Sequence, residues 1–189
     1  LIQSSHMVSL LLGMELMGVA LYAMIAFPEK GELPLEGAIK YLVLSACASA
    51  MLLYGFALIY AATGSLSYLG IGAGAAEAYV QNPMLIMAGT AMVLAGIGFK
   101  LSVAPFHMWT PDVYEGAPTP VTGFLATVSK GAVFVALTRF YIDGNLHQYS
   151  GLNTALVVLA IASMLIGNWL ALRQENIKRL LAYSSIAHF

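Results

Sequence analysis

Long apolar runs separated by short polar segments dominate this chain. Five runs cover about residues 7–27, 41–62, 84–104, 121–141 and 152–172, and a sixth starts at 177 and continues to 189. A helix needs about 20 mostly apolar residues to cross the hydrocarbon core of a bilayer. The pattern therefore predicts an all-α fold, a polytopic bundle of transmembrane helices.

The segment 101–120, LSVAPFHMWTPDVYEGAPTP, interrupts this pattern. It is rich in aromatic residues and contains four prolines, at positions 105, 111, 118 and 120. Proline removes a backbone donor and disfavours helix in the residue before it, so a continuous helix is excluded. Irregular backbone at membrane depth is tolerated only inside protein or beside a wet cavity. We therefore expect an interrupted third helix, with a second piece inside the bundle around 105–115.

Two other polar segments are predicted to be connections. Residues 28–40 form a short charged loop, and residues 63–82 form a long connector rich in Gly, Ser and Ala. The connector contains GIGAGAAEA, which superficially resembles a glycine-rich nucleotide loop. That motif needs a preceding parallel strand, and none is indicated, so we exclude a nucleotide site.

The composition indicates a chain surrounded by lipid. Hydrophobic residues make up 60% of the chain and charged residues 9%, and the mean hydropathy is +0.82, whereas a soluble domain is about 25% charged. A net charge of −1 without a basic stripe argues against a nucleic-acid partner. Cys47 is the single cysteine, which excludes an internal disulfide and a cysteine-cluster metal site.

The distribution of Lys and Arg predicts the orientation, because cytoplasmic loops are enriched in these residues. If the 28–40 loop is cytoplasmic, most of the loop cations share that side: Lys30, Lys40, Arg173, Lys178 and Arg179. The opposite side holds only Arg139, so residue 1 is expected outside. The chain has no initiating Met and ends in the early turns of an apolar run. We therefore expect it to be a fragment of a longer protein.

Three ionisable side chains lie well inside apolar runs: Glu15, Lys100 and Lys130. A charged side chain costs roughly 2.5–3.5 kcal/mol at the centre of a membrane helix on insertion scales. Such residues therefore face the protein interior, pair with one another or line an ion path.

Small and hydroxyl residues near Lys130 indicate an interior face. Helical spacing predicts that Gly123, Thr127 and Phe134 share the face of Lys130. Small residues allow helices to approach closely in a membrane. We therefore expect this face to point into the bundle.

Reversible protonation is the chemistry that these residues favour. Burial disfavours the charged form of a lysine or glutamate, and a nearby opposite charge favours it. A buried lysine beside a glutamate keeps its proton while the glutamate is close, and can release it to water and hydroxyl groups when the glutamate withdraws. The alternative is a structural pair that locks two helices together. Three such residues beside an interrupted helix favour proton transport.

For several residues near the break, the sequence leaves two interpretations open. His107 either carries protons near neutral pH or serves as a hydrogen-bonded structural group. Asp112 and Glu115 either cap or gate the broken segment, or are simply solvated. The basic segment RQENIKR at 173–179 sets the topology, with contact to a neighbouring protein as the weaker option.

The run GFKLSVAPFHMWTPDVYEGAPTPVTGFLATVSKGAVFVALTRF, at 98–140, closely resembles the subunit N family of respiratory complex I, the NADH-quinone oxidoreductase. This family includes mitochondrial subunit 2 and its chloroplast counterpart. FHMWTPDVYEGAPTPV carries its signature, whereas the related subunits L and M read differently after TPD. GMELMGVALYAMIAF, KYLVLSACASAMLLYGFALIYAATGSL and NIKRLLAYSSIAH are similar to further segments of the family, in the expected order. The resemblance covers nearly the whole chain.

The resemblance implies an antiporter-like fold in which two inverted helical repeats each contain a broken helix. Glu15 in GMEL, Lys100 in GFKLS and Lys130 in TVSKG match ionisable residues of the family's proton path. His107 in PFHMW matches the histidine of the broken segment, and Lys178 in NIKRLL matches the basic residue that opens the following helix. The second repeat's lysine falls outside this chain.

The resemblance also implies a function. It indicates a proton-translocating subunit of a membrane enzyme complex, most simply in a bacterial inner membrane, with other complex I membrane subunits and lipid as partners. NADH, FMN, Fe–S clusters and quinone are then bound by partner subunits, with no cofactor-binding, redox or metal site expected in this chain. A cation/proton antiporter subunit of related fold and a structural membrane scaffold remain as alternatives, and VYEGAP argues against the antiporter.

Overall fold

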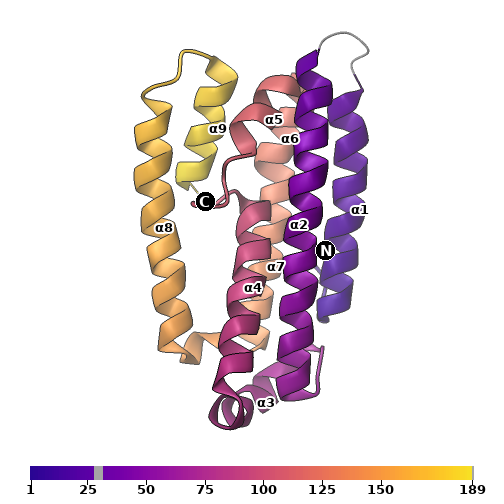
Figure 1. The fold of residues 1–189 in the computed structure, drawn as a ribbon, viewed down its shortest axis with the longest axis vertical. Helices are drawn as coiled ribbons and strands as arrows, with labels where there is room; N and C mark the ends of the chain where they lie inside the picture. Colours follow the sequence, from indigo (N-terminus) through magenta and orange to yellow (C-terminus); the bar gives the residue numbers. More distant parts are fainter. Residues whose placement is uncertain (28–31, 189) are drawn as a thin grey trace.

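A computed structural model of the chain describes residues 1–27 and 32–188, and its regular elements are helical. Figure 1 shows long, roughly parallel helices, with α3 at one end and α5 and α9 towards the other. The α-helices are α1 (Met7–Ala26), α2 (Glu32–Thr63), α3 (Tyr68–Gln81), α4 (Pro83–Leu101), α5 (Thr110–Gly116), α6 (Thr119–Phe124), α7 (Lys130–Asp143), α8 (Ser150–Ala171) and α9 (Ile177–His188). A π-helical turn, η1 (Leu125–Ser129), joins α6 to α7, and a 3₁₀ turn, η2 (Leu146–Gln148), precedes α8.

Within the described residues, five helical stretches are long and apolar enough to cross a membrane. They are α1, α2, α4, the continuous stretch Thr119–Asp143 and α8. The prediction of an all-α bundle of transmembrane helices is confirmed.

Two segments predicted as connections contain helix: the loop prediction is wrong for residues 32–40, whereas 63–82 does connect two membrane spans but does so through a helix. α2 begins at Glu32, so residues 32–40 extend the membrane helix by more than two turns, while residues 28–31, including Lys30, lie outside the described part of the chain. The 63–82 connector contains α3, which buries Tyr68, Ile71, Ala75 and Ala78. These four residues have helical spacing, but the intervening glycines suggested a loop. Gly72 in α3 allows close approach, because a Cβ there would lie 3.0 Å from the Asp143 carbonyl oxygen.

The interruption after α4 matches the sequence prediction. Ser102 adopts a left-handed conformation, with a φ of 62°, and its N–H caps carbonyls at the end of α4. The chain then turns until α5 begins at Thr110. Pro111 lies in the first turn of α5 and Pro120 in the first turn of α6. A missing N–H is tolerated in a first turn, so these prolines begin short helices.

Glycines bring α2 and α4 into close contact. A Cβ on Gly55 would lie 2.7 Å from the Gly89 carbonyl oxygen, and a Cβ on Gly96 would lie 2.9 Å from the Ala48 carbonyl oxygen. In a membrane, where burial against lipid gives little driving force, small residues strengthen helix association by allowing this approach. The α2–α4 contact therefore fixes the height of Lys100, in the last turn of α4, relative to α2.

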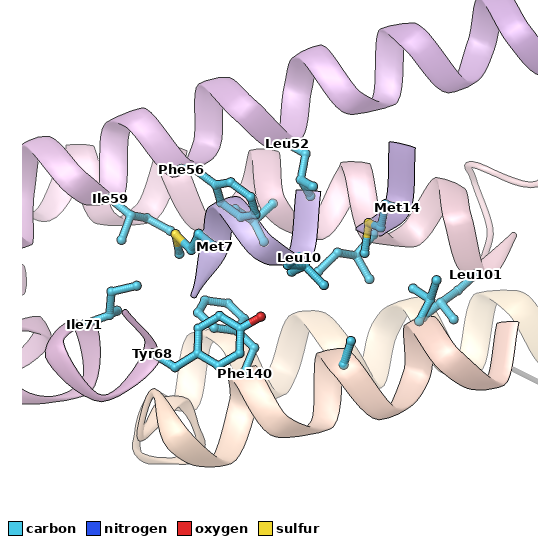
Figure 2. Close-up of a cluster of buried hydrophobic side chains, with 14 of the residues drawn as sticks. Met7, Leu10, Met14, Leu52, Phe56, Ile59, Tyr68, Ile71, Leu101 and Phe140 are labelled. Atoms are coloured by element: carbon cyan, nitrogen blue, oxygen red, sulfur yellow. The ribbon is translucent and has the colours of Figure 1, made fainter. Parts of the chain in front are cut away.

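Apolar packing completes the bundle at the α3 end. Figure 2 shows side chains of α1, α2, α3, α4 and α7 meeting in one buried cluster. Tyr68 and Phe140 contact each other there, with ring centroids 5.1 Å apart. At the other end, Trp109 of the interrupted segment stacks on Tyr41 at 4.7 Å and donates from Nε1 to the Phe99 carbonyl oxygen at 3.1 Å. The interrupted segment is thus held inside the bundle.

Helices α8 and α9 stand to one side of the remaining helices (Figure 1). They pack closely on each other, because a Cβ on Gly167 would lie 2.8 Å from the Ala187 nitrogen. Of the α8 side chains, Ser163 reaches the interrupted segment, where its Oγ accepts a 2.8 Å hydrogen bond from the Ala104 N–H. This buried bond ties α8 to the break after α4.

Candidate functional site

Glu15 is half-buried on α1 and faces α2. Its Oε1 accepts a hydrogen bond from the Ser49 hydroxyl of α2. A carboxylate can only accept hydrogen bonds, whereas its protonated form can also donate one. The hydroxyl partner therefore suits a carboxyl group that changes protonation state.

Lys100 is buried in the last turn of α4, with 5% of its surface exposed. Its Nζ donates to the Ser45 hydroxyl of α2 at 2.6 Å and lies 5.9 Å from the centre of the Tyr41 ring. The carbonyl end of a helix and the face of an aromatic ring both attract a cation. The ammonium thus has a neutral partner in each of these contacts.

Ser45 and Ser49 bring Glu15 and Lys100 to one face of α2. They are separated by one helical turn, and side chains at i and i+4 are neighbours on a helix surface. The ion pairs within residues 1–27 and 32–188 do not include one between Glu15 and Lys100. The two ionisable groups therefore lie on neighbouring hydroxyls.

Lys130 is the most enclosed of the three ionisable residues, with 1% of its surface exposed. Its Nζ donates to the Ser185 hydroxyl of α9 at 2.7 Å and lies 5.9 Å from the centre of the Tyr114 ring. The Tyr114 hydroxyl lies 3.5 Å from the same Ser185 oxygen. Helices α5, α7 and α9 thus meet at Lys130.

The prediction that Gly123 and Thr127 share the face of Lys130 is wrong, because the helix before Lys130 is not a regular α-helix. Gly123 and Thr127 are exposed and Phe134 is 50% exposed, while Lys130 is buried. The π-helical turn η1 immediately precedes Lys130, and its i→i+5 bonding adds a residue to one turn. This shifts Lys130 away from the face of Gly123 and Thr127. Turns of this kind occur frequently at functional sites.

His107 lies buried in the interrupted segment, with its ring 6.5 Å from that of Tyr183 on α9. Its Nδ1 and the hydroxyls of Ser102 and Thr110 are buried and have no hydrogen-bond partner in the described part of the chain. Unsatisfied buried polar atoms are rare in native proteins and are usually satisfied by water or another group. Within the described residues, the buried polar side-chain atoms that have no hydrogen-bond partner therefore all lie at the break after α4.

Asp112 and Glu115 take part in a network of ion pairs, so simple solvation, one of the two interpretations left open by the sequence, does not describe them. Arg179 Nη1 lies 2.8 Å from Asp112 Oδ1 and 2.9 Å from Glu115 Oε2. Lys40 Nζ lies 2.7 Å from Asp112 Oδ2. Burial raises the pKa of the Asp112 carboxyl, but hydrogen bonds from Lys40 and Arg179 outweigh it and hold the pKa below its ordinary value. These four residues, called the end cluster below, connect α2, α5 and α9.

Lys178 extends this network to the backbone. Its Nζ donates to the carbonyl oxygens of Glu115 at 3.3 Å and Ala117 at 2.9 Å. These carbonyls are at the end of α5, where a helix attracts a cation. Lys178 therefore holds the end of α5 against the start of α9.

The structure brings Glu15 of α1 and Lys100 of α4 to the same face of α2. It places Lys130 of α7 in a second setting, in contact with α5 and α9. Sequence reasoning missed their partners Ser45, Ser49 and Ser185. The i, i+4 spacing of Ser45 and Ser49 in an otherwise uncharged apolar run was the available signal. Among the described residues, no group of three or more His, Cys, Asp or Glu side chains is placed to hold a metal ion.

Comparison with known proteins shows the family. The chain is 50% identical over 187 residues to NADH-quinone oxidoreductase subunit N of Nitrosospira multiformis, covering 99% of this chain and 37% of that protein. It is 50% identical over 188 residues to the subunit of the same name in Methylococcus capsulatus, covering 100% and 38%. A chain in the structure of respiratory complex I from Thermus thermophilus superposes with a TM-score of 0.81 at 40% identity, over 99% of this chain and 39% of that one.

The chain thus spans less than two fifths of the length of these relatives. A family model for the transmembrane region of NADH:quinone oxidoreductases and Mrp antiporters matches residues 4–189, almost the full length of the chain. With its apolar helices, this makes the chain an integral, multi-pass membrane protein. It belongs to the NADH:quinone oxidoreductase/Mrp antiporter transmembrane family.

Proposed function

We propose that this chain is part of a proton-translocating membrane subunit of an NADH-quinone oxidoreductase in a bacterial inner membrane. Glu15, Lys100 and Lys130 carry the proton through the part of the path that this chain contains. The two relatives named NADH-quinone oxidoreductase subunit N support this proposal. Electron transfer from NADH to quinone takes place elsewhere in the complex and drives the transport.

The observation that carries the proposal is the setting of the two lysines. Lys100 and Lys130 are both buried, and each donates to a serine hydroxyl of another helix. A carboxylate partner would stabilise a buried ammonium strongly, whereas a neutral hydroxyl does so less and can itself accept and donate protons. An intramembrane lysine with such a partner is suited to release and regain a proton.

His107 and Lys178 have separate places in this proposal. His107 adjoins the unsatisfied hydroxyls of the interrupted segment, so it serves as a proton carrier between the setting of Lys100 and that of Lys130. Lys178 binds carbonyl oxygens of α5, which supports a positioning role for the segment that contains Tyr114.

The partners of the chain follow from the same proposal. The other membrane subunits of the complex cover part of its apolar surface, and lipid covers the rest. NADH, FMN, Fe–S clusters and quinone are bound by other subunits.

A cation/proton antiporter subunit is the second candidate, because the matching family model includes Mrp antiporters. The identity of 50% to two subunit N sequences favours the oxidoreductase. Proton transport by the full-length protein within its assembled complex, measured in vesicles, separates the two. Transport that needs NADH and is unchanged by sodium supports the oxidoreductase, and sodium-driven proton exchange without NADH supports the antiporter.

The Lys130→Ala substitution in the full-length subunit, within the assembled complex, tests the proposal directly. We expect proton translocation per NADH oxidised to fall by roughly tenfold or more, since a positioned proton-transfer group contributes about 10²–10⁴-fold. Arg173→Ala is the matched control, because Arg173 is an exposed cation that stacks on Trp169. Unchanged pumping and quinone reduction in an assembled Lys130→Ala complex would contradict the proposal and favour a scaffold.

A further inference from the structure

The hydroxyls of Ser45 and Ser49 differ in their hydrogen-bond partners from the hydroxyl of Thr63, which is also on α2. Thr63 donates to the Ile59 carbonyl oxygen, one turn back on its own helix, at 2.8 Å, which is the usual arrangement for hydroxyls in helices. Ser45 and Ser49 instead bind ionisable side chains from α4 and α1. The two serine hydroxyls therefore bind side chains of other helices rather than the backbone of α2.

We propose that Ser45 and Ser49 form a proton relay between Lys100 and Glu15. The proposal rests on the proposed function and adds two residues to its path. Each serine contacts one ionisable group directly, and the two serines are neighbours on one face of α2. The Cβ atoms of an i, i+4 pair are about 5–6 Å apart, a span that one water molecule bridges by hydrogen bonds to both hydroxyls.

Gly18 of α1 lets the Lys100 ammonium and the Tyr22 hydroxyl lie close to the α1 backbone. Gly18 is one turn from Glu15, and a Cβ at this position would lie 3.7 Å from Lys100 Nζ and 3.0 Å from the Tyr22 hydroxyl oxygen. With hydrogen in place of a side chain, α1 allows both polar groups to pack beside the last turn before Tyr22. Ser45 is fully buried and Ser49 half-buried, so the relay leads from the interior towards the α1 surface.

The relay moves one proton and regenerates both hydroxyls. A proton passes from Lys100 Nζ to Ser45 Oγ as the original hydroxyl proton of Ser45 passes to the water. The water passes one of its protons to Ser49 Oγ, and Ser49 passes its original proton to Glu15 Oε1. Lys100 ends as a neutral amine and Glu15 as a neutral acid, so the two opposite charges disappear together. The reverse transfer restores them.

Serine substitutions in the full-length subunit of the assembled complex test the relay. The set comprises Ser45→Ala, Ser49→Ala, the double variant, Ser49→Thr, and Lys100→Ala as the reference for loss of the path. Thr63→Val is the matched control, because it removes a hydroxyl from α2 that binds a backbone carbonyl. The measurements are protons translocated per NADH oxidised and the solvent deuterium isotope effect on pumping.

We expect the double variant to lose about tenfold in protons per NADH and each single variant to lose less, since a rebound water partly replaces one hydroxyl. Ser49→Thr keeps the hydroxyl and retains most of the pumping, and Thr63→Val pumps normally. The Glu15 carboxyl band in difference infrared spectra, identified by its loss in Glu15→Gln, shifts in Ser49→Ala and returns in Ser49→Thr. A purely structural serine would not produce this recovery.

Two other outcomes have distinct meanings. If Lys100→Ala abolishes pumping while the double serine variant pumps normally, the relay is wrong and the proposed function stands. If Lys100→Ala itself pumps normally, the proposed function is wrong and the relay is wrong with it. Should the double variant fail to assemble, Ser49→Ala against Ser49→Thr decides, because Ser49 is only half-buried and its loss leaves little cavity.

Discussion

The interior lysines and the end cluster contain the same kinds of side chain in opposite settings. Lys100 and Lys130 donate to serine hydroxyls at 2.6 and 2.7 Å. In the end cluster, Arg179 and Lys40 lie 2.7–2.9 Å from carboxylates. Charges paired with opposite charges are held in one protonation state, whereas a hydroxyl partner such as that of Lys100 favours the charged form less strongly. The difference separates cations that fix helices from cations suited to carry protons.

The two settings also differ in what they connect. The end cluster joins α2, α5 and α9 close to the exposed end of the bundle, where its side chains are 27–40% exposed. The interior residues join α1 to α2, α2 to α4 and α7 to α9. A change in the end cluster should therefore alter stability, and a change in the interior should alter transport.

Glu15→Gln should produce the largest difference between the two settings. Glutamine keeps the shape of the side chain and can still accept from Ser49, but it cannot take up a proton. We expect proton translocation per NADH to fall by roughly tenfold or more, with the thermal unfolding midpoint nearly unchanged. Glu77→Gln is the matched control, because Glu77 is exposed on α3 and binds Gln81. Equal pumping by the two variants would count against a proton-carrying Glu15.

Arg179→Ala should have the opposite profile. It removes the guanidinium shared by Asp112 and Glu115 and leaves both carboxylates in a half-buried position. We expect a loss of about 1–2 kcal/mol in the free energy of unfolding, between the values for exposed and buried pairs. Detergent-denaturation curves of the purified subunit measure this change. Pumping per NADH by the assembled fraction should be retained, and its loss would place Arg179 in the path.

The sequence predicted the spans and the break because both depend on local composition. Apolar runs of sufficient length and the prolines of 101–120 define them without reference to the rest of the fold. The α3 helix was missed because its glycines, which allow contact with Asp143 and Gly144, also look like loop residues. Here a tertiary contact overrode local propensity.

The site was only half predictable for a related reason. Charges inside apolar runs identified Glu15, Lys100 and Lys130 from the sequence alone. Their partners depend on how the helices pack, so the contacts of Ser45, Ser49 and Ser185 were hidden. Gly123 and Thr127 were wrongly predicted on the face of Lys130 because a single π-helical turn changes the register, and no residue of LATVS indicates such a turn.

Gly18→Ala tests the interior setting of Lys100 with a smaller expected effect on pumping. The added Cβ would lie 3.0 Å from the Tyr22 hydroxyl and 3.7 Å from Lys100 Nζ, so the Tyr22 side chain must shift and the packing beside the ammonium changes. We expect a decrease of about threefold in protons per NADH, well below the roughly 10²-fold that larger misplacements cost. Gly123→Ala is the control, because a Cβ there meets no atom within 4 Å. Equal pumping by both variants would show that the close packing beside Lys100 has no role in transport.

The smallest effect should come from the pH response of the end cluster. The pKa of Asp112 is held below its ordinary value in the folded protein. The stabilisation is therefore fully present above the unfolded pKa of about 3.9 and is lost as the pH falls through the folded value. The unfolding midpoint of the wild-type protein should fall in that acidic range, and that of Asp112→Asn should fall less. Between about pH 5 and 8 Asp112 keeps its charge, so Asp112→Asn should leave the pH profile of pumping unchanged. A shifted profile would mean that Asp112 exchanges protons with the path, and the distinction between fixed and mobile protons would then fail at this residue.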